Sequence, residues 1–110
     1  MEKANVTVVQ QIIGKAKQCE ENSQQCWLSN ETFNNLMKEV DKPSLSKEGY
    51  LIFEGKGEGC NLKFEISLER CQTSSAFAKL IRISEANWYT GAERRAIYKI
   101  PESTQNIRIL

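Results

Sequence analysis

The spacing of apolar residues changes part-way along the chain, and this change constrains the fold more than any other feature. In the segment CNLKFEISLER, residues 60–70, the even positions from Cys60 to Leu68 are apolar and the odd positions are polar. Strict alternation of this kind predicts a strand with one buried and one solvated face, which is typical of an antiparallel sheet. Before residue 49, by contrast, apolar residues recur every third or fourth position, as in amphipathic helices.

The first helical pattern covers residues 6–21. Val9, Ile12, Ala16 and Cys19 share one face of a helix at this spacing. The β-branched run VTVV would also suit a strand, so residues 6–13 allow both structures. Gly14 is unfavourable inside a helix, and its small size suggests that another element approaches closely there.

The second helical pattern follows Ser29 and Asn30, either of which can cap the first turn. Its apolar stripe consists of four residues at i, i+3, i+4 and i+7: Phe33, Leu36, Met37 and Val40. Trp27 and Leu28 precede the cap and are expected to pack against the first turns of this helix. Both helical segments therefore lie within residues 6–42.

Four further segments predict strands around the alternating one. They are residues 50–54, 76–84 and 95–101, with a short terminal segment at 106–110. The predicted fold is therefore α+β, with two N-terminal helices packed on one face of a four- to five-stranded antiparallel meander sheet. We expect one domain over residues 1–110, helical over 6–42 and built as a sheet over 49–110.

Composition excludes several kinds of active site. The chain has no histidine, which removes the commonest general base and the commonest metal ligand. The glycine-rich residues 55–59 lead into a strand, so they predict a hairpin and not a phosphate-binding loop before a helix. The spacings of the four cysteines do not match a zinc knuckle; free thiols are favoured over one or two disulfides, and a metal site is the weakest alternative. No catalytic residue, cofactor or metal is predicted.

The net charge of +1 and the absence of an apolar run long enough to cross a bilayer predict no membrane binding. The N-terminal segment has no continuous apolar stretch of the kind found in secretion signals. We therefore expect a cytoplasmic protein.

Residues 84–99, SEANWYTGAERRAIYK, contain the strongest signal for binding. Tyr, Trp and Arg are enriched in the centres of protein interfaces. The predicted partner-binding residues are Trp88, Tyr89, Arg94, Arg95, Arg82 and Lys99. Adjacent residues of a strand point to opposite faces, so one aromatic residue and one arginine are expected to share an exposed side with Lys79 or Arg82. The same stretch is also consistent with a simple turn between two strands.

These features favour a small non-enzymatic interaction protein that binds another protein or a second copy of itself. An accessory inhibitor or adaptor from a phage or other mobile element is one such protein. The alternative is binding of single-stranded DNA or RNA through the aromatic and basic residues of the C-terminal strands. Residues 76–110 carry six Lys and Arg against three Glu, which is a weak positive charge for that purpose. The third hypothesis is an enzyme that uses Glu, Lys or Tyr.

Overall fold

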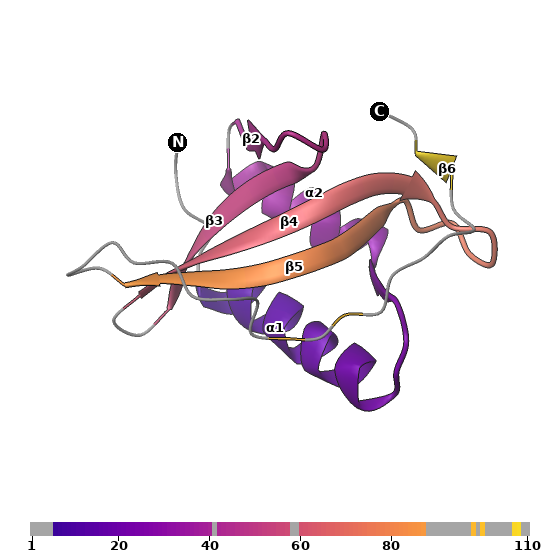
Figure 1. Cartoon of the computed structure of the whole chain (residues 1–110), viewed down its shortest axis with the longest axis horizontal. Coiled ribbons are helices and arrows are strands. Elements are labelled where there is room, and N and C mark those ends of the chain that lie inside the picture. Colours follow the sequence, from indigo (N-terminus) through magenta and orange to yellow (C-terminus); the bar gives the residue numbers. More distant parts are fainter. Residues whose placement is uncertain are drawn as a thin grey trace.

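A computed structural model describes residues 6–40, 42–57, 60–87, 98, 100 and 107–108. Its elements, in chain order, are α1 (Val6–Glu21), β1 (Cys26–Leu28), α2 (Asn30–Glu39), β2 (Ser44–Leu45), β3 (Leu51–Gly57), β4 (Cys60–Arg70), β5 (Ala78–Asn87) and β6 (Ile107–Arg108). The open antiparallel sheet has the order β1-β5-β4-β3-β2, and β6 pairs with the far end of β4. α1 and α2 lie on the same side of the three long strands (Figure 1). The predicted α+β fold is confirmed.

α1 coincides with the predicted helix over residues 6–21, so the β-branched start does not form a strand. Its end is fixed by two backbone hydrogen bonds: the N–H of Ser23 donates to the carbonyl of Glu20 at 3.2 Å, and that of Gln24 to Cys19 at 2.8 Å. Ser23 has a φ of 52°, in the left-handed region. This pattern is the Schellman motif, which satisfies the last carbonyls of a helix and reverses the chain.

α2 begins where the sequence predicts. The Ser29 side chain caps the helix by accepting a hydrogen bond from the Thr32 N–H at 3.1 Å. Phe33 and Leu36 are buried on its inner face, whereas Met37, at the edge of the stripe, is 39% exposed. The chain before the cap forms a strand that the sequence pattern does not indicate, because Trp27 and Leu28 belong to β1 and pair with β5. The segment 6–42 is therefore not wholly helical.

β4 shows the predicted alternation. Leu62, Phe64 and Ile66 are buried, and β4 pairs with β3 on one side and β5 on the other. The connection at residues 71–77 and the glycine-rich hairpin join these three strands into the predicted meander, and β2 extends it beyond β3. The predicted strand at 95–101 lies mostly outside the described residues; Tyr98 and Ile100, which are described, are not in a strand.

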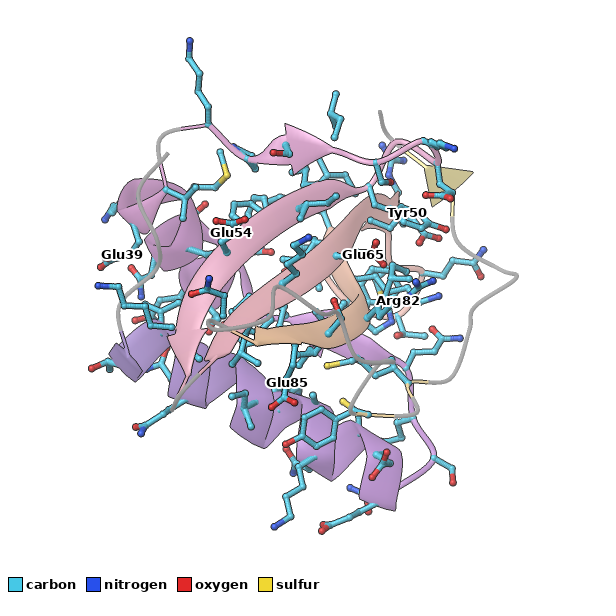
Figure 2. All side chains as sticks on the ribbon, turned by 60° about the vertical axis from the view of Figure 1, so that its left-hand side comes forward. Glu39, Tyr50, Glu54, Glu65, Arg82 and Glu85 are labelled. Atoms are coloured by element: carbon cyan, nitrogen blue, oxygen red, sulfur yellow. The ribbon has the colours of Figure 1, made fainter. Side chains whose placement is uncertain are left out.

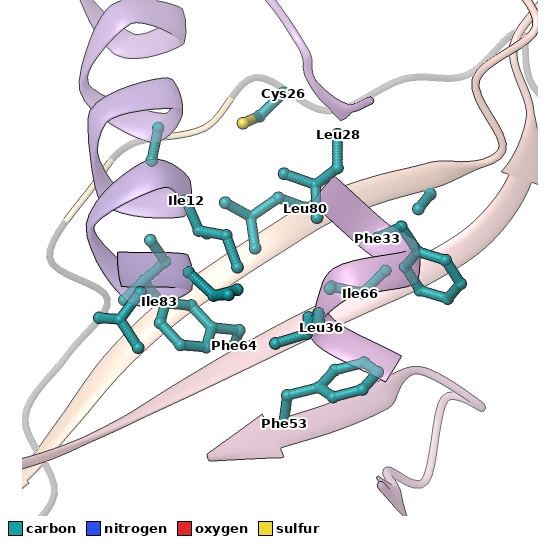
Figure 3. Close-up of a cluster of buried hydrophobic side chains, with 14 of the residues drawn as sticks. Ile12, Cys26, Leu28, Phe33, Leu36, Phe53, Phe64, Ile66, Leu80 and Ile83 are labelled. Atoms are coloured by element: carbon teal, nitrogen blue, oxygen red, sulfur yellow. The ribbon is translucent and has the colours of Figure 1, made fainter. Parts of the chain in front are cut away.

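The core lies between the helices and the inner face of the sheet (Figure 3). Phe33 of α2 packs edge-to-face against Phe53 of β3, with ring centroids 6.2 Å apart, and against Phe77, at 5.2 Å. Such edge-to-face contacts stabilise aromatic pairs beyond the burial of their area. The core therefore joins α2 to β3 and to the residue that directly precedes β5.

Close approach between α1 and the sheet takes place at Gly55 of β3, not at Gly14 as predicted. A Cβ atom built on Gly55 would lie 2.5 Å from Cγ2 of Val9 and 2.9 Å from Cε2 of Phe64. A Cβ atom on Gly14 would meet no atom of the described residues within 4 Å. The prediction for Gly14 is wrong because its side of α1 faces away from the sheet. Neither helix of the described chain is long and apolar enough to cross a membrane.

Candidate interaction surface

The face of the sheet opposite the helices carries most of the polar side chains of the long strands. Cross-strand pairing aligns these residues in two rows, each of which crosses β3, β4 and β5. The rows are Ile52–Glu65–Arg82 and Glu54–Lys63–Ser84. We call these six residues the charged face. Arg82 is exposed and the other five are half-buried, so the surface is accessible without being fully solvated.

A β-bulge in β5 places Arg82 on this face. Ile66 pairs with Leu80, but the preceding Glu65 pairs with Arg82, so Ile81 is an extra residue in β5. Without that residue, Arg82 would share the face of Leu80, which is buried in the core. The bulge also explains why Leu80 and Ile83, three positions apart, both point into the core.

An ion pair lies at the centre of the charged face. The Arg82 Nε lies 3.1 Å from Oε2 of Glu65, and the arginine side chain remains 55% exposed while that of Glu65 is 18% exposed. The Glu65 Oε2 atom is itself buried and makes no well-aligned hydrogen bond within the described part of the chain. The largely buried Glu65 carboxylate therefore fixes the guanidinium of the more exposed Arg82. A partly exposed pair of this kind contributes only about 0.2–1 kcal/mol to stability. Its main effect is on the orientation of Arg82.

The turn between β2 and β3 forms the rim of the charged face. Its backbone is held by hydrogen bonds between Ser46 and Tyr50, and Gly49 adopts a φ of 85°. The pKa of the Glu48 carboxyl is lowered by a hydrogen bond from its own backbone N–H, then by Ser46, and further by the nearby cations Arg82 and Lys47. Figure 2 shows Tyr50, Glu65 and Arg82 close together at one end of the strands. This rim adds an aromatic and an anionic group beside the arginine.

The next row along the sheet is buried, in contrast to the charged face. Ser67 of β4 lies opposite Lys79 of β5, and they are 0% and 3% exposed. Lys79 in turn lies opposite Trp27 of β1, whose indole N–H donates to the Gln25 side chain at 3.1 Å. Among the residues that the structure describes, the Ser67 hydroxyl oxygen has no hydrogen-bond partner. The prediction that Lys79 belongs to the exposed side is therefore wrong, because this end of the outer face is covered.

The structure describes only one of the six predicted partner-binding residues. Arg82 lies on the exposed outer face, next to Glu65. Trp88, Tyr89, Arg94, Arg95 and Lys99 lie outside the described residues. Two described residues near them in the sequence, Tyr98 and Ile100, pack against the hydrophobic core. Sequence reasoning did not select Ile52, Glu54, Lys63 or Glu48 for binding, although the alternating pattern already placed Lys63 and Glu65 on a polar face.

The cysteines occupy two different environments. Burial, followed by the hydrogen bond and proximity of Cys19, raises the pKa of the Cys26 thiol far above its ordinary value. Burial acts in the same direction on Cys71, but hydrogen bonds from the side chains and backbone N–H groups of Ser74 and Thr73 outweigh it and lower that pKa to about 7. Cys19, Cys26 and Cys71 are all free. Over the described ranges, no group of three or more metal-ligating side chains is present.

Comparison of the chain with protein-family models, with curated proteins and with solved structures gave no match.

Proposed function

We propose that this chain is a non-enzymatic interaction domain that binds a protein partner through the charged face, with Arg82 as its central contact. The observation that carries the proposal is the state of Arg82, which is held by Glu65 at 3.1 Å while more than half of its side chain remains exposed. An arginine oriented in advance loses less conformational entropy when it binds a carboxylate or backbone carbonyls. Arginine is also among the residues most enriched at binding hot spots.

The surroundings of Arg82 support a protein partner. Ile52 supplies apolar surface in the same row, and Tyr50 stands at the rim (Figure 2). Protein interfaces combine an apolar centre with polar groups that fix the orientation of the partner. The contact expected from this surface is a partner carboxylate on Arg82 and an apolar side chain on Ile52.

The charge of the same surface argues against nucleic acid. Glu54 and Glu65 balance Lys63 and Arg82 within the two rows, and Glu48 adds a further carboxylate at the rim. Single-stranded nucleic acid needs a groove with excess positive charge along its phosphates. The described part of the outer face provides none, so binding of DNA or RNA is the less favoured function.

A charge reversal at Arg82 tests the proposal. The full-length wild type, Arg82→Glu and the control Lys17→Glu are immobilised and exposed to an extract of the native host. Lys17 is exposed on α1, in the helical layer and away from the charged face, so the control makes the same change of charge. A protein that is retained by the wild type and the control but lost with Arg82→Glu is then purified and titrated. We expect its affinity for Arg82→Glu to fall at least about 10-fold.

Two other outcomes contradict the proposal. If Arg82→Glu retains the partner as well as the wild type does, the charged face is not the binding site. Binding of single-stranded DNA that weakens steeply with salt, measured by fluorescence polarisation, supports the nucleic-acid alternative instead. Sedimentation velocity on the wild type and on Arg82→Glu shows whether the partner is a second copy, because a homodimer formed through this face dissociates in the variant.

A further inference from the structure

The end of α1 and the start of β1 bring two thiols together inside the core. Cys19 lies in the last turn of α1, and Cys26 is the first residue of β1. Between them, the Schellman motif folds the chain back on itself, because the Gln24 N–H donates to the carbonyl of Cys19 at 2.8 Å. Cys26 follows only two residues later. The backbone therefore returns to the level of Cys19 just before Cys26.

The side chains complete this approach. Cys19 is 2% exposed and Cys26 0%, and both belong to the same core cluster. The sulfur of Cys26 is directed toward α1 (Figure 3), and the Cys19 thiol lies near enough to help raise the pKa of Cys26. A disulfide between the two sulfurs requires the Cα atoms to lie about 4.4–6.8 Å apart.

We infer that Cys19 and Cys26 form a dithiol site that is oxidised to an intramolecular disulfide by low-molecular-weight disulfides such as oxidised glutathione. Cys71, whose sulfur lies 3.4 Å from the Thr73 hydroxyl, is in the separate loop after β4 and is not part of this site. The inference is independent of the proposed function, because neither cysteine belongs to the charged face.

The exchange proceeds in two displacements. The Cys19 thiol loses its proton and its sulfur attacks oxidised glutathione, forming a protein–glutathione disulfide and releasing one glutathione thiolate. The Cys26 thiol then loses its proton and attacks the sulfur of Cys19. The Cys19–Cys26 bond forms as the bond to glutathione breaks, and the second glutathione leaves. Two electrons and two protons thus pass from the protein dithiol to glutathione.

Cys19 is assigned the first displacement because of its position. Residues 20–24, which follow it, are all exposed, so unwinding the last turn of α1 uncovers its sulfur. Cys26 is held in a strand paired with β5, where Leu80 lies opposite. Burial also keeps the Cys26 thiol protonated, which makes it a poor nucleophile for the first, intermolecular attack, so Cys26 reacts only after Cys19 has become the target beside it.

Peptide mapping of the full-length protein tests the inference directly. The wild type is incubated with oxidised glutathione, quenched with acid, alkylated without reduction and digested with trypsin. No Lys or Arg lies between Lys17 and Lys38, so residues 18–38 form one peptide that holds both cysteines. We expect this peptide to lack both alkyl groups and to be lighter by two hydrogens. Cleavage at Glu20 or Glu21 should leave its two parts joined until a reductant is added.

Variants that remove one thiol each provide the controls. Cys71→Ser should still form the Cys19–Cys26 disulfide, whereas Cys19→Ser and Cys26→Ser should lose it completely. Circular dichroism identifies any variant that fails to fold, and the wild-type map does not depend on the variants. The inference is overturned if the folded wild type keeps both thiols of the 18–38 peptide under strongly oxidising glutathione, or if Cys19 or Cys26 instead pairs with another cysteine.

Discussion

The two faces of β4 differ in what they contribute to the molecule. On the even face, Phe64 and Ile66 are 0% exposed and are sealed by the helices. On the odd face, one residue away, Glu65 supports an arginine that is 55% exposed. Burial of large apolar side chains supplies most of the stability of a small domain, whereas exposed ion pairs supply little. One strand therefore separates the face that stabilises the fold from the face that we propose for recognition.

Truncation of the buried face is expected to have the largest effect. Phe64→Ala removes a fully buried ring and leaves a cavity between β4 and α1, which should lower the free energy of unfolding by about 3–5 kcal/mol. Urea unfolding followed by circular dichroism measures the loss. Glu65→Ala, at the next position of the same strand, should cost about 1 kcal/mol or less. Similar losses at the two positions would break the distinction between the faces.

Addition of a methyl group at Gly55 is expected to have the next largest effect. The new Cβ atom of Gly55→Ala would press on Val9 and Phe64 at the distances of 2.5 Å and 2.9 Å given above. Overpacking of this kind should destabilise the domain by about 1–3 kcal/mol. Thermal and urea unfolding both measure this loss of stability. An unchanged midpoint would mean that α1 does not pack against β3 as closely as described.

The same change at Gly14 should act in the opposite direction. Gly14 is exposed inside α1, and a Cβ atom there meets nothing within 4 Å. Gly14→Ala should stabilise the domain by about 0.5–1 kcal/mol, because alanine loses less backbone entropy in a helix. The two glycine variants, measured under one set of conditions, form a matched pair. A loss of stability in Gly14→Ala would show that this side of α1 has a neighbour.

The Arg82–Glu65 pair is expected to give a smaller free energy. A double-mutant cycle with Arg82→Gln and Glu65→Gln should yield a coupling of about 0.2–1 kcal/mol that decreases as salt is added. Urea unfolding gives the change in the free energy of unfolding for each variant. The coupling is the change in the double mutant minus the sum of the changes in the two single mutants. A coupling above about 2 kcal/mol would show that the charged face contributes to the stability of the fold after all.

The reactivity of Cys71 should change with pH around neutrality. Because its pKa is lowered to about 7, the thiolate forms as the pH rises through that value, and alkylation by iodoacetamide should reach half its maximal rate near pH 7. Thr73→Val removes one of the hydrogen bonds to the sulfur and should shift this midpoint upward. Labelling is followed on the tryptic peptide of residues 71–79. A midpoint near the ordinary value of 9.0 in the wild type would contradict the assigned environment.

The sequence alone was sufficient for the elements whose pattern is local. The spacing of Ile12, Ala16 and Cys19 predicts α1, the Ser29 cap predicts the start of α2, and the alternation through Phe64 predicts β4. Each of these signals lies within one or two turns or a few residues of the element that it specifies. Because the periods of 3.6 and 2 decide which face is apolar, they also determined the α+β class and the layer of helices on one side of the sheet.

The tertiary structure decided what depends on distant partners. β1 and β2 are too short to show a pattern of their own, and they form because β5 and β3 offer free edges. The extra residue Ile81 turns Arg82 outward, and only the pairing of β5 with β4 reveals it. Likewise, the close approach at Gly55 joins β3 to Val9 of α1, two segments whose distance in space no local period encodes.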